Sequence, residues 1–170
     1  MSYELIICEK PSQALKIAEA LADKKITKKN YLKVPYYELT HNKKDIIVGC
    51  AVGHLFGLKE KNKGAWVYPT FDYEWQPTYK ISKQSSFNKK YLDTLTKLSK
   101  EASEFTVACD YDIEGSLIGY NCIRFIAKRK DARRMKFSTL TKKELIISYE
   151  SASKSLDFPQ IESGETRHTL

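Results

Sequence analysis

The stretch Phe105-Thr-Val-Ala-Cys-Asp-Tyr-Asp-Ile-Glu-Gly-Ser-Leu-Ile-Gly-Tyr120 decides the fold. It opens with a short, β-prone apolar run at 105–109, which predicts a buried strand. Apolar residues on one face then predict a helix over 114–126. Acidic residues stand between the two, where the strand gives way to the helix. Because the functional residues of parallel α/β sheets gather at the carboxyl ends of strands, this stretch predicts a βα unit and a candidate site together.

The same alternation continues on both sides of this stretch. Short apolar runs predict further strands at 4–8, 36–40, 45–50 and 135–137, and periodic apolar positions predict further helices from Pro11 to near Asp23, at 87–100 and at 141–151. Ser12 is the expected N-cap of the first helix. We expect a loop or weak surface strand at 24–33 and extended, loop-rich structure at 59–86. The order of elements predicts the α/β class, with a central, mostly parallel sheet and helices on both faces.

Length and composition are those of a globular domain. The chain has 170 residues, 42% of them hydrophobic, and 29 Lys plus Arg against 21 Asp plus Glu give a net charge of +8. This composition excludes collagen-like and low-complexity chains, and no apolar run is long enough for a membrane span. Glu4 and Glu9 make the N-terminus unlike a secretory signal, so we expect a cytoplasmic protein that binds no membrane. The basic balance is a weak indication of a polyanionic partner.

The four cysteines indicate a reducing compartment. No pair of them has CxxC spacing, which argues against a zinc ribbon. Cys8, Cys50 and Cys109 lie in or at the end of apolar runs, so we expect buried free thiols.

The acidic residues of the central stretch are candidate metal ligands. Asp110 and Asp112 lie two residues apart in extended chain, so they face the same side, and Glu114 joins them as the helix begins. Three repelling carboxylates are tolerated when a cation lies among them, and hard oxygen ligands favour Mg²⁺ over zinc. An EF-hand is a poor match because its twelfth position is Asn121 and a strand precedes the loop. A solvated acidic turn, compensated by the helix dipole, is the remaining alternative.

A second candidate follows the first predicted strand. If the strands that end at Cys8 and Cys109 are neighbours, Glu9 lies beside the acidic cluster. A carboxyl among carboxylates has a raised pKa, which suits a general acid and makes Glu9 a further candidate metal ligand. Lys10 supplies a cation that can meet a phosphate. The alternative is an ordinary surface loop.

Basic residues gather between Arg124 and Lys136. They predict either a phosphate-binding surface beside the metal site or a solvated helix end whose cations complement the dipole. The candidate DNA-binding residues are Arg124, Lys128, Arg133, Lys136 and Arg167. The aromatic stretch 66–79 can stack bases, although core and loop packing is the commoner use of such residues.

Taken together, the motifs resemble the TOPRIM domain of type IA DNA topoisomerases, and most closely its archaeal members. The resemblance rests on stretches that occur in the family's order: Glu9-Lys10-Pro11-Ser12-Gln13-Ala14, Val52-Gly53-His54-Leu55-Phe56, Asp110-x-Asp112-x-Glu114-Gly115, Arg134 to Thr141, and Arg167-His168. It implies a Rossmann-like TOPRIM domain over 1–155 and the truncated start of a following region over 156–170. Ile113 and Ser116 depart from the family's usual arginine and acidic residue.

The resemblance also implies a mechanism. A tyrosine attacks a phosphodiester of single-stranded DNA, another strand passes the gap, and the 3′-hydroxyl reseals it. Glu9 would handle the proton on the 3′-oxygen and Lys10 would stabilise phosphoryl charge. His54 and Arg134 would support the site or contact the DNA backbone. Asp110, Asp112 and Glu114 would hold Mg²⁺, which is needed mainly for resealing.

In this family the nucleophilic tyrosine lies downstream, in another domain. We therefore expect a monomeric, inactive fragment whose partners are DNA and the remaining domains of the same enzyme. Two alternatives stay open at this point: a primase-like or nuclease TOPRIM domain, and a non-catalytic nucleic-acid-binding module.

Overall fold

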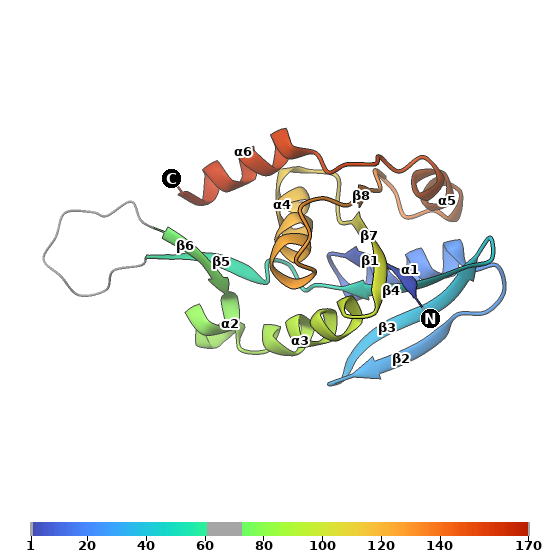
Figure 1. The fold of residues 1–170 in the computed structure, drawn as a ribbon, viewed down its shortest axis with the longest axis horizontal. Helices are drawn as coiled ribbons and strands as arrows, with labels where there is room; N and C mark the ends of the chain where they lie inside the picture. The colour runs from blue at the N-terminus through green and yellow to red at the C-terminus, as the bar shows by residue number, and fades with distance from the viewer. Residues whose placement is uncertain (1, 61–72, 170) are drawn as a thin grey trace, which may run out of the picture.

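A six-stranded sheet forms the centre of the molecule in the computed structural model, which describes residues 2–60 and 73–169. The strand order is β2-β3-β4-β1-β7-β8 (Figure 1). The strands are β1 (Tyr3–Cys8), β2 (Thr27–Tyr31), β3 (Val34–His41), β4 (Lys44–Cys50), β7 (Ala102–Ala108) and β8 (Arg133–Arg134). Strands β4, β1, β7 and β8 are parallel, and β3 pairs antiparallel with both of its neighbours. The predicted mostly parallel α/β sheet is therefore confirmed.

Strand β1 lies at the middle of the sheet and has both faces buried. Leu5 and Ile7 belong to one hydrophobic cluster, and Ile6 and Cys8 belong to the other. This division follows from the two-residue period of a strand, which sends successive side chains to opposite faces. A run of consecutive apolar residues is the pattern expected where helices cover both sides of a parallel sheet.

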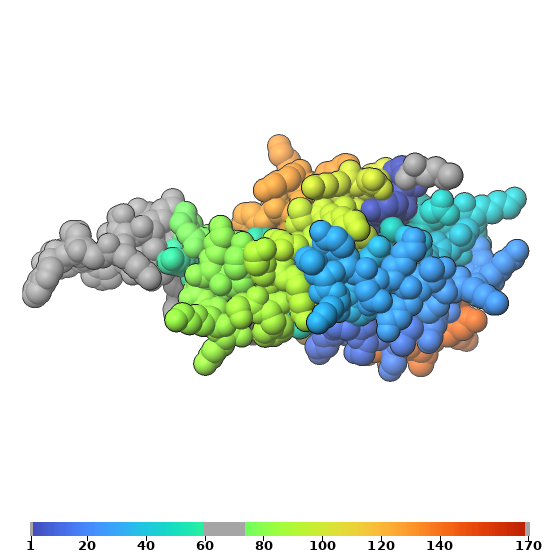
Figure 2. Space-filling view, turned by 90° about the horizontal axis from the view of Figure 1, so that it is seen from below, coloured from blue at the N-terminus to red at the C-terminus, as the bar shows by residue number. Residues whose placement is uncertain are grey.

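Helices cover the two faces as predicted (Figure 1). On one face lie α1 (Pro11–Leu21) and α5 (Lys142–Glu150), which share a hydrophobic cluster. On the other lie α3 (Asn88–Ser99) and α4 (Ile113–Asn121), with a π-helical turn at Cys122–Ile126 that continues α4. Figure 2 shows α3 beside the hairpin of β2 and β3, where the Thr94 hydroxyl donates to the carbonyl oxygen of Tyr31 over 3.2 Å.

Residues 59–86 hold more regular structure than predicted. Strands β5 (Phe56–Glu60) and β6 (Tyr73–Pro77) form an antiparallel pair, and the short helix α2 (Thr78–Ile81) follows. The extended chain expected here is present in β6, whereas the short helix α2 was not expected, because a single helical turn is too short to show a period. Part of the aromatic stretch, 66–72, lies outside the described residues.

The end of the chain forms a helix that the sequence analysis did not predict. Residues Phe158–Thr169 form helix α6, which packs on α4. A Cβ on Gly164 would lie 3.1 Å from the Cβ of Leu117, so the two helices meet at a glycine. The sequence did not predict α6 because its apolar side is too short to give a clear pattern. The surface it packs on belongs to α4, which is distant in the chain.

Two element boundaries differ from the prediction, and one weakly indicated strand is present. Lys10, not Ser12, is the N-cap of α1, because Pro11 already occupies the first helical turn. Strand β8 lies at Arg133–Arg134 and not at 135–137. The weak strand expected within 24–33 forms as β2. Among the described residues, no helix is long and apolar enough to cross a membrane.

Candidate functional site

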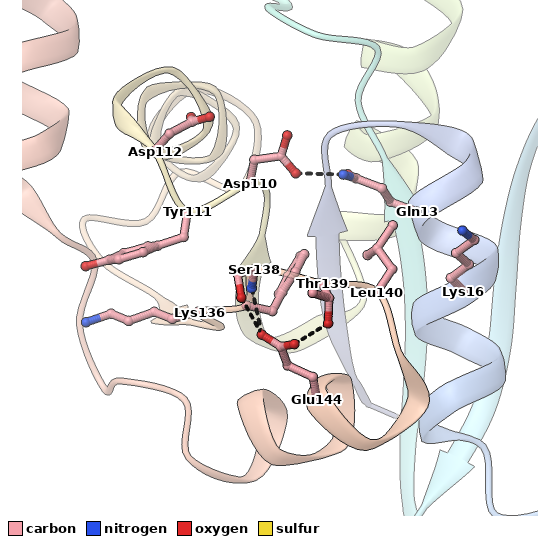
Figure 3. Close-up of a pocket in the computed structure, with 11 residues that line it drawn as sticks. Gln13, Lys16, Asp110, Tyr111, Asp112, Lys136, Ser138, Thr139, Leu140 and Glu144 are labelled. Carbon is pink, nitrogen blue, oxygen red and sulfur yellow. Dashed lines mark hydrogen bonds between the residues drawn. The ribbon is translucent and has the colours of Figure 1, made fainter.

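A short acidic loop links β7 to α4 at the carboxyl edge of the sheet. Asp112 is the N-cap of α4, and its Oδ1 accepts a hydrogen bond from the backbone N–H of Gly115 over 2.6 Å. The Oδ1 of Asp110 accepts from Nε2 of Gln13 in α1 over 2.7 Å (Figure 3). Both predicted aspartates are therefore held by defined partners at the place that the sequence indicated.

Gly115 allows helix α4 to begin against this loop. A Cβ at this position would lie 2.0 Å from the carbonyl oxygen of Asp110. That distance is far below van der Waals contact, and the atom it meets belongs to the backbone. Any larger residue would push the helix away from the loop and move Asp112 with it.

Arg134 holds the same loop through hydrogen bonds to its backbone. Its side chain is completely buried, and its guanidinium donates to the carbonyl oxygens of Cys109 over 2.7 Å and of Asp110 over 2.8 Å. It also lies 3.3 Å from the Ser116 hydroxyl. Burial lowers the pKa of Arg134, and the nearby Asp112 charge opposes this. Of the two roles expected for Arg134, this position favours support of the site, because a buried guanidinium does not reach a DNA backbone.

Glu9 lies beside Asp110 because β1 and β7 are parallel neighbours whose ends, Cys8 and Ala108, are paired. Burial raises the pKa of Glu9 to about 7, with a further contribution from Asp110, while the Lys10 charge acts in the opposite direction. The Oε2 atom of Glu9 is buried and has no hydrogen-bond partner. The neighbouring strands and the raised pKa agree with the expectation for a proton-transferring carboxyl.

The pKa of Glu9 predicts a pH dependence of folding. A carboxyl whose pKa rises from 4.5 to about 7 on folding stabilises the protein fully below pH 4.5. That contribution is lost as the pH rises through about 7. In a chelator, the free energy of unfolding should therefore fall more between about pH 5 and about pH 8 in the wild type than in Glu9→Gln.

Urea unfolding at the two pH values measures this difference, and Glu162→Gln on the exposed face of α6 is the matched control. A carbon NMR titration of the Glu9 carboxyl should give a midpoint near 7 that moves down in Asp110→Asn. An ordinary carboxyl midpoint in the wild type would contradict the prediction.

Glu114 turns toward two imidazoles. Its Oε2 lies 2.7 Å from Nε2 of His54 and 3.4 Å from Nε2 of His168, and Arg167 lies 4.0 Å from its Oε1. Partial burial acts to raise the pKa of Glu114, but the hydrogen bonds with His54 and His168 lower it overall. Burial lowers the pKa of His54, against the effect of Glu114. Among the described residues, His54, Glu114 and His168 form a group of three potential metal ligands. Their donor atoms all lie within 4.8 Å of one another.

A cavity of about 800 Å³ opens beside the aspartates (Figure 3). Asp110 and Asp112 line one part of it, and Lys16 from α1 and Lys136 line others. The ammonium of Lys136 lies 5.2 Å from the ring centre of Tyr111. The cavity thus joins carboxylates that suit a cation with lysines that suit an anionic ligand.

The predicted DNA-binding residues lie in three different places. Lys136 and Arg167 lie beside the carboxylates. Arg124 packs over the rings of Trp75, Tyr120 and Phe125 and pairs with Glu165 at 3.0 Å.

The remaining two are Lys128 and Arg133, and Arg133 lies in β8, in register with Thr106 of β7. Arg133 pairs at 3.3 Å with the fully buried carboxylate of Glu4, near the start of strand β1. Lys128 precedes Arg129, which stacks on Phe105. Neither Lys128 nor Arg133 lines the cavity beside the aspartates.

Sequence reasoning did not assign three residues of this region. Gln13 stands within the Glu9 motif, one helical turn after it, and that spacing was its available signal. His168 adjoins the predicted Arg167, but only the packing of α6 on α4 brings it to Glu114. Lys16 carried no distinguishing signal among the other lysines.

Comparison with known proteins identifies the domain family. The sequence profile of the Toprim domain matches residues 4–140. The chain is 50% identical over 167 residues to the DNA topoisomerase 1 of Methanocaldococcus jannaschii, which covers 98% of this chain and 21% of that protein. It is 46% identical over 168 residues to the DNA topoisomerase 1 of Pyrococcus furiosus, covering 98% of this chain and 16% of that protein.

The chain thus spans about a fifth of the length of the curated relatives it matches. Among solved structures, full-length topoisomerase I from Thermotoga maritima has the same fold over 98% of this chain and 23% of its own, with a TM-score of 0.66 at 20% identity. Because the Toprim profile matches 4–140 of the 170 residues, this chain belongs to the Toprim domain family.

Proposed function

We propose that this chain is the metal-binding part of a type IA DNA topoisomerase, an enzyme that cuts and rejoins single DNA strands through a phosphotyrosine link. One observation carries the proposal. Glu9, with its raised pKa, lies beside Asp110 and Asp112 at the carboxyl ends of two parallel neighbouring strands. The relatives named DNA topoisomerase 1 support it, because they match 98% of this chain.

The oxygen atoms of this site fit a Mg²⁺ ion. Glu9 has a buried and unpartnered Oε2, and the carboxylates of Asp110 and Asp112 adjoin it. Such hard oxygen donors favour Mg²⁺ over softer metals. Glu9, Asp110 and Asp112 would hold the ion, with Glu114 able to join after a side-chain rotation. When bound, Mg²⁺ supplies positive charge beside the phosphate that is being rejoined.

The other residues have roles that follow from their positions. Glu9 would hold the proton that passes to and from the 3′-oxygen. Lys10, exposed at the start of α1, would stabilise phosphoryl charge. Lys16 and Lys136 would bind backbone phosphates along the cavity, and Arg167 would do so beside Glu114. Arg134 would act as a positioning residue through the carbonyl oxygen of Asp110.

The attacking tyrosine belongs, under this proposal, to another domain of a larger protein. Tyr111, next to the aspartates, donates its hydroxyl to Asp157 over 3.0 Å and lies over Arg134, which suits a packing role. Under this proposal the Toprim unit spans 1–155 and a following region begins at 156. The protein is monomeric and lies in the cytoplasm with chromosomal DNA. The partners are single-stranded DNA and the remaining domains.

A chimera tests the proposal. In it, this chain replaces the matching 167 residues of the Methanocaldococcus jannaschii protein. At a temperature where circular dichroism shows the chimera folded, it should relax negatively supercoiled DNA when Mg²⁺ is present and not in a chelator. The isolated chain should form no covalent complex with the same DNA.

The outcomes separate the alternatives. A folded chimera without Mg²⁺-dependent relaxation would overturn the proposal. Covalent complex formation by the isolated chain would refute the assignment of the tyrosine to another domain. Metal-dependent nicking without resealing would instead indicate a nuclease, and primer synthesis would indicate a primase-like enzyme.

A further inference from the structure

His54, Glu114 and His168 form a compact group of donor atoms at one side of the acidic loop. The Oε2 atom of Glu114 lies 2.7 Å from Nε2 of His54 and 3.4 Å from Nε2 of His168. All three donor atoms lie within 4.8 Å of one another. The two imidazole rings have centres 4.9 Å apart at an angle of 65°, so they converge on the carboxylate from different directions.

The three residues come from elements that hold one another in place. His54 follows β4 in the chain, Glu114 lies in the first turn of α4, and His168 lies in the last turn of α6. Helix α6 is fixed to α4 by the glycine contact at Gly164 and by a 2.6 Å hydrogen bond from Ser116 to Gln160. The arrangement is therefore a product of tertiary packing and is not a chance meeting of mobile side chains.

Two imidazoles and one carboxylate are a ligand set for borderline divalent metals. Zn²⁺ binds nitrogen and oxygen ligands at about 2.0–2.2 Å, so tetrahedral ligand atoms lie about 3.3 Å apart. The observed 2.7 and 3.4 Å lie on either side of that value, and small side-chain rotations satisfy it. The side chains are 27%, 40% and 30% exposed, which leaves an entry path and a fourth position for water.

We propose that His54, Glu114 and His168 bind a borderline divalent transition-metal ion, of which Zn²⁺ is the type, at a site distinct from the oxygen site of Glu9, Asp110 and Asp112. Glu114 is the residue that the two sites can share. Mg²⁺ discriminates against imidazole, while Zn²⁺ favours it. An ion on the histidines therefore keeps Glu114 away from the aspartates, whichever reaction the oxygen site serves.

The histidine content of the chain makes a sharp test possible. The chain has three histidines, and the remaining one, His41, donates from Nδ1 to the carbonyl oxygen of Leu21 at the end of α1 and serves as an internal reference. The untagged 170-residue chain, labelled with ¹⁵N and freed of metal, is titrated with ZnCl₂ near neutral pH. We expect the imidazole signals of His54 and His168 to change up to one equivalent, with His41 unchanged.

Calorimetry with ZnCl₂ gives the affinity. Replacement of an exposed ligand, His168→Ala, should weaken binding at least about 10-fold, and His54→Gln should do the same. The matched control, His41→Gln, and the oxygen-site variant Asp110→Asn should bind Zn²⁺ as the wild type does. MgCl₂ alone should leave the imidazole signals of His54 and His168 in place.

The same measurements can overturn the proposal. Unchanged affinity in His168→Ala would do so, provided that circular dichroism shows the variant folded, as expected for a residue at the exposed end of α6. A loss in Asp110→Asn as large as that in His168→Ala would place the ion at the oxygen site instead. Equal perturbation of His41 would indicate unspecific binding to imidazoles.

Discussion

Replacing Asp112 by asparagine is expected to lower the relaxation rate of the chimera about 100-fold or more, with almost no change in its stability. The size follows from the several kcal/mol of transition-state charge stabilisation that a bound metal ion supplies. Asp112 has a second role as the N-cap of α4, where its Oδ1 accepts from Gly115. Asparagine caps helices as well as aspartate does, so Asp112→Asn removes the charge and keeps the cap.

Two further variants separate these roles. Asp112→Ala should lose the same activity and also about 1 kcal/mol of unfolding free energy, because the cap is gone. Asp45→Asn, an exposed aspartate at the start of β4, is the matched control and should change neither quantity. Relaxation rates are measured over a range of Mg²⁺ concentrations, and stability is measured by urea unfolding. Wild-type activity in Asp112→Asn would exclude Asp112 as a metal ligand.

Replacing Arg134 by methionine should lower the free energy of unfolding of the 170-residue chain by about 3 kcal/mol. Methionine has a similar length and no donors. The carbonyl oxygens of Cys109 and Asp110 would lose the buried N–H groups that now bind them. Each buried acceptor left without a partner costs about 1–3 kcal/mol, and relief from burying a charge offsets part of the sum.

A matched pair of variants checks the cause. Arg134→Lys keeps the charge but its single ammonium cannot replace the planar guanidinium at two carbonyls, so an intermediate loss is expected. Arg167→Met, on the exposed face of α6, should stay within about 0.5 kcal/mol of the wild type. Urea unfolding of the four proteins decides the matter. A loss in Arg134→Met no larger than that in Arg167→Met would show that the buried hydrogen bonds contribute little.

Local pattern was enough to predict the elements that carry the site. The strands at 4–8 and 105–109 and the helix after Asp112 are strongly apolar and short, and the structure has them within a few residues. The position of Glu9 beside Asp110 could also be predicted, provided that the strands ending at Cys8 and Cys109 are neighbours, as β1 and β7 are. The pairing of β5 with β6 could not, because the sequences of these two strands are weakly periodic. The helix α6 could not either, because it packs on α4, which is distant in the chain.

The residues that support or extend the site were harder to predict than the ligands. Arg134 was a motif residue with two possible roles, and only its complete burial distinguished them. The sequence treats the basic residues from Arg124 to Lys136 as one group, either a phosphate-binding surface or a solvated helix end. In the structure these residues have different partners. Arg124 packs on aromatic rings and Arg133 pairs with the buried Glu4. Of these three residues, only Lys136 lines the cavity.

By itself, the sequence determined the α/β class, the acidic loop at a strand end and the identity of its carboxylates. These depend on hydrophobic period and on the direct succession of strand, loop and helix, which are local properties. Only the tertiary structure decided where Glu114 turns, because His54 and His168 reach it from segments 60 and 54 residues away. Side-chain partners across such distances are set by packing between elements, and no periodicity along the chain encodes that packing.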